Sequence, residues 1–331
     1  MNVLVTGATG YIGGELVPAL LAAGHRVRVL SRRAGALDDR SWGDRVDLAV
    51  GDASEEEDLY RAMDGVEVAY HLLHSMDGQD DFAGRDRRIA EAFAAAADRA
   101  EVRRIVHLGG IHPDQASLSP HMASRREVAD ILLNGPVPAV VLRAAVILGA
   151  GSASYAMLRH LTSRLPVMIT PKWVQNRVQP IAIADVRHYL VGAAEMPGEL
   201  NRTFDIAGPD VLTYAEMMQR FAALNDLGPR PVVSIPVLTP WLASHWVGLI
   251  TPVSPGVAKP LVGSLVDDAV AAEHDIDDHL PPPLGGPTSF DEAVREAEDQ
   301  LEPDTALRDV AGGLLAVGAV AAAMVASRLR R

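Results

Sequence analysis

The chain has 331 residues, of which 48% are hydrophobic and 22% are charged, as in folded globular proteins rather than disordered ones. Its formal net charge of −13 argues against a general nucleic-acid or anionic-lipid binder, because phosphate binding depends on clustered Lys and Arg side chains. The chain has no cysteine, which excludes disulfides, thiolate zinc sites and cysteine nucleophiles and fits a reducing compartment.

The first residues, MNVLV, form an apolar strand-like run without the basic region, apolar core and cleavage site of a secretory signal. We therefore expect a cytoplasmic protein.

Apolar runs of strand length alternate with helical patterns over the first half of the chain. These runs are residues 3–7, 26–30, 46–50, 66–72, 103–109 and 138–148. Continuous Val, Ile and Leu are typical of parallel strands that helices cover on both faces. The pattern predicts an α/β fold with a doubly wound parallel sheet of the Rossmann type and a smaller C-terminal cap.

Local signals predict where several helices begin and end. Apolar residues at four-residue spacing, Ile12 to Leu20, indicate a first helix that stops at Gly24. The pairs Ser54–Glu57 and Thr213–Glu216 each have the spacing of a capping box and predict two further helix N-termini.

We expect three parts. Residues 1–150 form the doubly wound core, residues 151–303 complete it and form an apolar cap, and residues 304–331 form an Ala/Gly-rich C-terminal helix. Residues 231–258 have no charged side chain, but five prolines argue against one straight spanning helix. This stretch is either a buried cover over the sheet or a lid that lines an apolar substrate pocket, and the two are compatible.

The C-terminal tail leaves two alternatives open. Residues 310–327 are uncharged but consist largely of Ala, Gly and Val, and a basic cluster follows them. The tail is either a packed or membrane-surface helix, with contact through residues 310–331, or an anchor at the inner face of the membrane. A spanning helix would move the terminal arginines away from a cytoplasmic body, against the positive-inside tendency.

Residues 5–16, VTGATGYIGGEL, place a glycine-rich turn between the first strand and the first helix. Free N–H groups at a helix N-terminus bind a pyrophosphate. Gly7 would form the tight turn, Gly10 would admit the backbone close to the phosphates, and Gly13 would let the helix pack on the sheet. The context predicts dinucleotide binding, with a purely structural turn as the alternative.

The end of the second strand predicts which dinucleotide binds. An acidic residue there would hold the ribose 2′-hydroxyl of NAD, but this chain has Arg32 and Arg33, which suit a 2′-phosphate. We therefore expect NADP(H) in preference to NAD(H), the alternative being a solvated basic turn. Asp52, after the third strand, is placed to accept a hydrogen bond from the adenine amino group.

Several polar residues near the strand ends are candidates for substrate contacts. His71 and His74 suggest a metal site, but alternation along a strand would point them to opposite faces, so we expect no metal. His74 and Ser75 follow the fourth strand, where ligands bind in open α/β sheets, and we expect them beside the substrate or nicotinamide. Tyr155 either faces the same crevice or belongs to the core.

Five motifs together resemble the atypical short-chain dehydrogenase/reductase superfamily, in particular NmrA-like and complex I 39-kDa-subunit-like NAD(P)-binding proteins. They are TGATGYIGG at 6–14, GD at 51–52, AYHLLHSM at 69–76, QPIAIADV at 179–186 and FDIAGPDVLTY at 204–214. This resemblance covers residues 1–225. The region that follows is similar to bacterial proteins described as predicted nucleoside-diphosphate-sugar epimerases or NAD(P)H-binding oxidoreductases.

The resemblance implies an extended, atypical Rossmann fold and a set of cofactor contacts. The implied contacts are Gly7, Thr9, Gly10, Tyr11, Ile12, Gly13, Arg32, Arg33, Asp52, Ala53, Leu72 and Leu73. Leu72 and Leu73 would lie beside the cofactor ribose.

Catalysis departs from the family pattern. Working enzymes of the family use a Tyr followed four residues later by a Lys, and the only lysines here, Lys172 and Lys259, follow Met168 and Pro255 at that spacing. By position, His121 and Arg125 replace the Tyr and the Lys, and Gly110 lies near the expected Ser.

Two interpretations of His121 and Arg125 remain open. In the first, His121 donates the proton, since an imidazole titrates near neutral pH, and Arg125 orients the ribose. In the second, His121 is a surface residue at a helix start, and Arg125 contacts an acidic neighbour or the cofactor.

These observations favour an NADP(H)-dependent oxidoreductase that acts on a small, apolar or lipophilic molecule. The alternative is a non-catalytic NADPH-binding sensor or assembly protein, because the Tyr–Lys pair is missing. Sugar-nucleotide epimerisation is the weakest of the three, because it usually needs the Tyr base. Analogy with the family suggests a homodimer.

Overall fold

The computed structural model describes most of the chain. The described residues are 1–74, 81–112, 118–165, 167–170, 172–234, 251, 253–254, 256–257, 261, 263 and 267–301. Three predictions lie wholly or largely outside them: the role of Ser75, the apolar stretch 231–258, and the tail 304–331.

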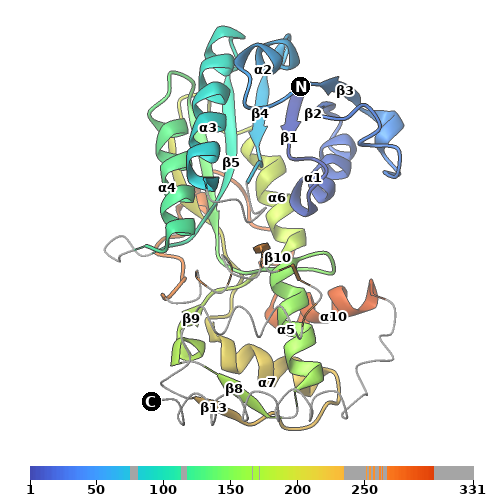
Figure 1. Ribbon diagram of the computed structural model, residues 1–331, viewed down its shortest axis with the longest axis vertical. Coiled ribbons are helices and arrows are strands. Elements are labelled where there is room, and N and C mark those ends of the chain that lie inside the picture. Colours follow the sequence, from blue (N-terminus) through green and yellow to red (C-terminus); the bar gives the residue numbers. More distant parts are fainter. Residues whose placement is uncertain are drawn as a thin grey trace.

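A seven-stranded parallel sheet forms the centre of the upper part of the molecule (Figure 1). Its strands, in spatial order, are β3 (Asp47–Val50), β2 (Arg26–Ser31), β1 (Asn2–Thr6), β4 (Val68–His71), β5 (Arg104–Gly110), β6 (Ala139–Ala144) and β11 (Arg202–Asp205). All neighbouring pairs run parallel. The predicted doubly wound sheet is confirmed, and the chain reverses its direction of winding between β1 and β4, the position at which such sheets bind ligands.

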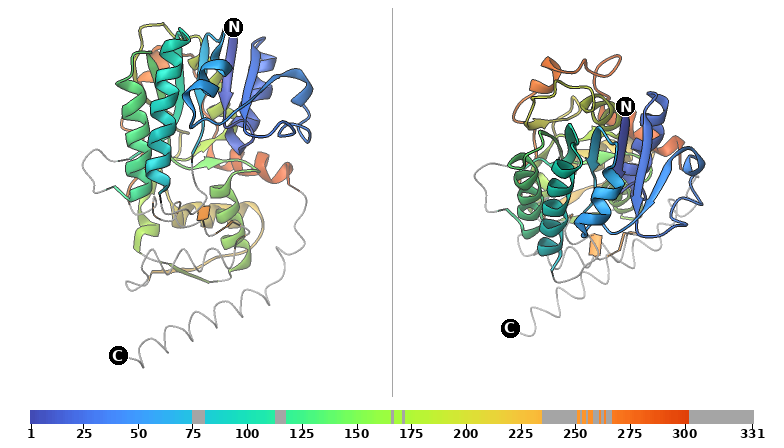
Figure 2. Two further views of the ribbon diagram at one scale, coloured as in Figure 1. Left: turned by 45° about the horizontal axis from the view of Figure 1, so that its top comes forward. Right: turned by 90° about the horizontal axis from the view of Figure 1, so that it is seen from above.

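Helices cover both faces of this sheet (Figure 2). One face carries α1 (Tyr11–Ala22) and α6 (Ile183–Ala193), and the other carries α2 (Glu56–Met63), α3 (Phe82–Arg99) and α4 (Pro120–Leu133). The predicted first helix is thus present, and Gly24 follows its end with a φ of +84°.

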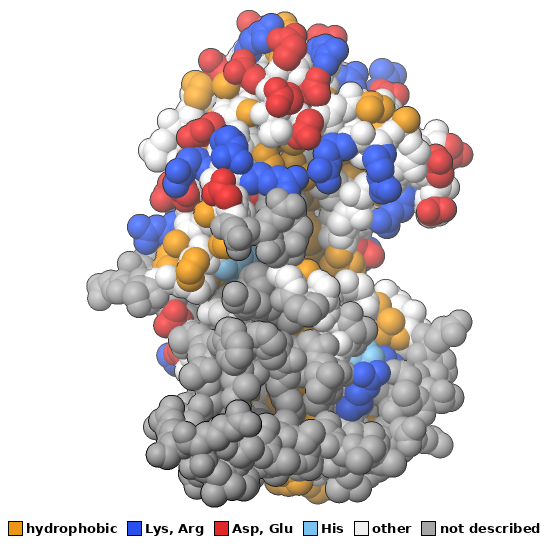
Figure 3. Space-filling model, viewed as in Figure 1, with side chains coloured by type: hydrophobic (Ala, Val, Ile, Leu, Met, Phe, Trp, Pro, Cys, Tyr) orange, Lys and Arg blue, Asp and Glu red, His pale blue; other side chains and the backbone are white. Residues whose placement is uncertain are grey.

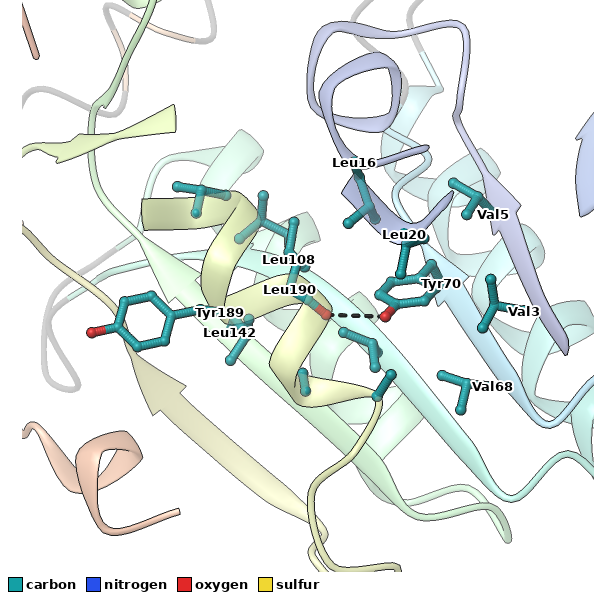
Figure 4. Close-up of a cluster of buried hydrophobic side chains, with 14 of the residues drawn as sticks. Val3, Val5, Leu16, Leu20, Val68, Tyr70, Leu108, Leu142, Tyr189 and Leu190 are labelled. Carbon is teal, nitrogen blue, oxygen red and sulfur yellow. Dashed lines mark hydrogen bonds between the residues drawn. The ribbon is translucent and has the colours of Figure 1, made fainter. Parts of the chain in front are cut away.

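The strands are buried because side chains pack on both of their faces. All four residues of β4 are buried, and β6 is buried at every position except Arg143. Between the sheet and α6, the Tyr70 ring lies among Val and Leu side chains, and its hydroxyl donates to the Leu190 carbonyl at 3.0 Å (Figure 4). A buried hydroxyl needs such a partner, so this bond fixes α6 against β4.

The lower part of the molecule has a second core. Its helices are α5 (Ala153–Arg164), α7 (Tyr214–Leu224) and α10 (Phe290–Asp299). Three separate two-stranded sheets accompany these helices: β7 (Ile147–Leu148) with β10 (Ile181–Ala182), β9 (Arg177–Val178) with β12 (Leu212–Thr213), and β8 (Met168–Thr170) with β13 (Val232–Ser234). Three short 3₁₀ turns, Gly43–Arg45, Lys172–Gln175 and Asp275–Asp278, complete the described elements.

The two predicted capping boxes had different outcomes. Thr213 and Glu216 form the reciprocal bonds of a capping box at α7. The prediction at Ser54 is wrong: α2 begins at Glu56, because the Asp52 carboxylate accepts both the N–H and the hydroxyl of Ser54 and holds them in a turn before the helix. A capping box that the sequence analysis missed, Ser289 with Glu292, opens α10.

Within the described ranges, no helix is both long and apolar enough to cross a membrane.

The bond between β4 and α6 gives a first prediction. Replacing Tyr70 with Phe removes one buried hydrogen bond at nearly constant volume and should lower the free energy of unfolding by about 1 kcal/mol, with a Tm lower by roughly 2–4 °C. Tyr60→Phe, on the partly buried ring over which Arg99 stacks, is the matched control and should change stability by less than about 0.5 kcal/mol. Equal unfolding curves for the two variants would contradict this role for Tyr70.

Candidate functional site

The turn after β1 requires glycine at its first position. Gly7 has a φ of +78°, in the region that favours glycine, and a Cβ atom there would lie 2.7 Å from the Leu72 carbonyl oxygen. The end of β1 therefore contacts the chain that leaves β4 directly. This contact forms the floor of the crevice between the two strands.

The N-terminus of α1 faces this crevice. Gly10 caps α1, and no described side chain takes its place as an acceptor, so N–H groups of the first turn stay available for an anion. A Cβ atom at Gly13 would lie 2.4 Å from the Gly7 carbonyl oxygen, closer than real contacts allow. The helix can approach the turn only because residue 13 is glycine, and this approach gives the geometry that binds a pyrophosphate.

A pocket of about 580 Å³ opens beside this turn. It is lined by Thr6, Gly7, Thr9, Leu30, Ser31, Arg32, Arg33, Gly51, Asp52, Ala53, Leu73, His74, Arg85 and Ile89. The structure thus brings together eight of the predicted site residues: Gly7, Thr9, Arg32, Arg33, Asp52, Ala53, Leu73 and His74. Arg85 and Ile89 were missed, because both come from α3, whose placement against the pocket the sequence does not reveal.

Three arginines give the pocket its charge. Arg32 and Arg33 follow β2, and Arg85 reaches the same pocket from α3. Hydrogen bonds from Ser54, assisted by the positive charges of Arg32 and Arg85, lower the pKa of Asp52 below its usual range. On the face shown in Figure 3, basic side chains gather in a band across the lower edge of the nucleotide-binding part.

The remaining predicted cofactor contacts lie around the pocket rather than in its lining. Gly10 and Gly13 belong to the α1 N-terminus, with Ile12 partly buried between them, and Leu72 places its carbonyl beside Gly7. The Tyr11 ring packs against Gly149 and Gly151, and burial raises its pKa to about 12. Its hydroxyl is therefore not an acid at neutral pH.

Four histidines gather beside the pocket, at the carboxyl ends of β4 and β5. His107 Nδ1 lies 2.8 Å from the His71 carbonyl oxygen and 3.2 Å from His71 Nδ1. The rings of His74 and His121 lie 4.7 Å apart, and His74 Nδ1 is 3.1 Å from a carboxylate oxygen of Asp86. Burial lowers the pKa of all four, that of His71 to about 4 and that of His121 to about 3. Burial therefore disfavours a positive charge on each of the four rings.

The expectation that His121 is a surface residue is wrong. Its side chain is buried, because α4 packs on α3 and turns its first residues toward the end of β4. Arg125, one turn later, donates from Nη2 to the Leu108 carbonyl oxygen at 3.0 Å. The negative charge of Asp86 interacts favourably with its guanidinium group. Gly110 lies beside Arg125, so no hydroxyl occupies the position of the family's Ser.

Tyr155 belongs to the core, the second of its two expected placements. Its side chain is fully buried, and its hydroxyl donates to Glu298 at 2.6 Å, while Arg159 holds the same carboxylate. It is not among the residues that line the pocket. Among the residues that the structure describes, no group of three or more His, Asp or Glu side chains is placed to hold a metal ion.

Comparisons with known proteins agree with this geometry. A family model described as NAD(P)H-binding matches residues 7–161. A ceramide reductase of Caulobacter vibrioides is 30% identical over 232 residues, which cover 69% of this chain and 72% of that protein. The chain belongs to the atypical short-chain dehydrogenase/reductase superfamily of NAD(P)H-binding proteins.

A further relative and a solved structure are also similar to the chain. Subunit 9 of the mitochondrial NADH dehydrogenase (ubiquinone) 1 alpha subcomplex of Mus musculus is 24% identical over 76% of this chain and 67% of its own. The structure of Citrobacter sp. triphenylmethane reductase complexed with NADP(H) superposes with a TM-score of 0.68 at 19% identity and covers 90% of this chain and 100% of its own. This likeness shows the fold alone.

Neighbouring glycines of α1 give a matched test of the turn. In Gly13→Ala the new Cβ would meet backbone atoms of Gly7, so we expect a loss of about 1–3 kcal/mol of stability and a weaker affinity for NADPH. In Gly14→Ala the nearest atom, at 3.3 Å, is the mobile end of Arg40, so both quantities should be unchanged or improved. Thermal unfolding and an NADPH fluorescence titration measure both, and equal behaviour of the two variants would refute the close approach.

Proposed function

We propose that the protein is an NADP(H)-dependent oxidoreductase that acts on a small apolar molecule. The observation that carries the cofactor preference is the set of guanidinium groups of Arg32, Arg33 and Arg85 in one pocket. Each guanidinium group can donate two parallel hydrogen bonds to two oxygens of one phosphate, so this site favours a ribose with a 2′-phosphate. Asp52 comes from β3 rather than from the end of β2, and Ser54 already occupies its carboxylate, so it suits the adenine edge better than the 2′-hydroxyl.

The fit of a dinucleotide to this site rests on the glycine turn. Gly7 and Gly13 let the turn, the chain after β4 and the start of α1 meet at backbone distance, and the α1 N-terminus faces the crevice. When bound, the nicotinamide supplies a hydride to an electrophilic carbon, or takes one from an alcohol carbon. The protein has to bind the substrate beside that ring, exclude water and exchange the accompanying proton.

The proposal of an apolar substrate has two supports. The uncharged stretch 231–258 suits a cover for an apolar ligand, although most of it lies outside the described residues. The relative from Caulobacter vibrioides is a ceramide reductase, and its name specifies a lipid. Apolar pockets with few polar groups are the usual form of such sites.

A second candidate function is a non-catalytic NADPH-binding sensor or assembly protein. It is favoured by the missing Tyr–Lys pair and by the relative that is a subunit of an NADH dehydrogenase complex. Cofactor binding is common to both candidates, so only a test of hydride transfer separates them.

The arginines of the pocket predict the cofactor preference. The double change Arg32→Ala and Arg33→Ala should weaken NADPH binding by at least about 10- to 100-fold, because the loss of even one hydrogen bond between charged groups costs about 1.5–3 kcal/mol, while NADH affinity should change by less than about threefold. Arg26→Ala, at the opposite end of β2, is the matched control. Equal losses for both cofactors would show that no 2′-phosphate is bound there.

Isotope transfer tests the oxidoreductase activity itself. Two forms of NADPH, each deuterated at a different face of C4, are incubated separately with the protein and an extract of metabolites and lipids. The products are identified by mass spectrometry. We expect deuterium in an apolar product from one of the two labelled forms only. If NADPH binds but no protein-dependent label appears, the non-catalytic function is correct instead.

A further inference from the structure

Asp86 and His74 form a pair that neither the family pattern nor the cofactor contacts require. His74 follows β4, and Asp86 lies in the first turns of α3, which begins eight residues later. His74 Nδ1 and Asp86 Oδ2 are 3.1 Å apart. The Asp86 side chain is 6% exposed and that of His74 is 13% exposed. A carboxylate held so far from solvent fixes the orientation of the ring beside it.

The carboxylate also fixes the tautomer of His74. Because an ionised carboxylate only accepts hydrogen bonds, Nδ1 must bear the proton and donate to Asp86, which leaves Nε2 as the second nitrogen. In the part of the chain that the structure describes, this Nε2 is shielded from solvent and has no hydrogen-bond partner. Nδ1 of the neighbouring His121 ring is in the same condition.

Two neighbouring imidazole rings, each with a nitrogen that lacks a partner, indicate a place for an external polar group. A buried polar atom that lacks a partner costs free energy, so native structures rarely contain one without a functional reason. His74 also lines the dinucleotide pocket, as do Leu73 and Arg85. A substrate oxygen beside His74 would thus supply the missing partner close to the cofactor.

The geometry points to Asp86 and His74 as the proton-transfer pair of this site, with His74 as the catalytic group and Asp86 as its positioning residue. The inference rests on the proposed function. In carbonyl reduction, a hydride adds to the carbonyl carbon while Nε2 of protonated His74 gives its proton to the oxygen. The carbonyl becomes an alcohol, the nicotinamide is oxidised by two electrons, and neutral His74 takes a proton from solvent; alcohol oxidation reverses each step.

The charged and titratable groups around His74 determine how the rate of reduction should depend on pH. The groups that face His74 are Asp86 on α3, His71 on β4, His107 on β5, and His121 and Arg125 on α4. Burial and Arg125 lower the pKa of His74, whereas Asp86 raises it. Reduction needs the protonated ring, so its rate should fall as the pH rises through this pKa, and removal of the Asp86 charge should move that fall to lower pH.

The test compares the full chain with D86N and a matched control. Asp81→Asn removes the same charge from the N-terminus of the same helix and keeps an acceptor for Gly84. Long-range ¹H–¹⁵N spectra of histidine-labelled protein, assigned with His74→Gln, report the tautomer and pKa of His74 without any need for activity. We expect the Nδ1–H tautomer, a pKa lower by about one unit or more in D86N, and a change under about 0.3 units in D81N.

Kinetics with 9,10-phenanthrenequinone as an apolar carbonyl probe complete the test. We expect the falling limb of kcat against pH to move with the His74 pKa in D86N, and kcat to fall by about 10²-fold or more in His74→Gln, with KM little changed. An Nε2–H tautomer, or unchanged kcat and pH profile in His74→Gln, would overturn the pair while leaving the oxidoreductase intact. Absence of hydride transfer from the unmodified protein to the probe and to the extract would overturn the proposed function and, with it, the role of His74.

Discussion

The close approach of α1 to the turn after β1 is the contact on which the rest of the site depends. With glycine at 13, the helix start reaches the Gly7 carbonyl, and with glycine at 7, the turn reaches the chain that leaves β4. A side chain at either position would separate elements that now touch at backbone distance. The crevice between β1 and β4 and the direction of the helix N-terminus both follow from these contacts.

The two ends of the crevice differ in solvent exposure, and their charged groups behave differently as a result. Arg32 and Arg33 lie at its exposed rim, where charges keep their hydration until a phosphate replaces it. The histidines lie at its inner end, where desolvation disfavours their charged forms and makes each unpaired nitrogen costly. A dinucleotide needs both environments, because its phosphates are charged and its reacting ring must be kept from water. The sheet supplies them in one crevice, since both halves lie at the carboxyl ends of its strands.

The strands, the first helix and the glycine turn could be predicted from the sequence, because each depends on residues close together in the chain. Arg32, Arg33 and Asp52 were found for the same reason, since they directly follow predicted strands. Arg85 and Asp86 could not be found, because their positions depend on how α3 packs on α2 and α4. The same packing buries His121, whose local sequence, SPH at a helix start, is typical of a solvated position. The capping box predicted at Ser54 does not form because the nearby Asp52 carboxylate accepts the N–H and the hydroxyl of Ser54.

Calorimetric titration of the unmodified protein with NADPH and with NADH shows whether this crevice binds NADP(H). The three-arginine pocket predicts that NADPH binds at least about tenfold more tightly than NADH, the difference that one charged hydrogen bond to the 2′-phosphate supplies. Equal affinities, or tighter binding of NADH, would contradict the assignment of the arginines. Failure of both cofactors to bind would contradict the account of the glycine turn itself.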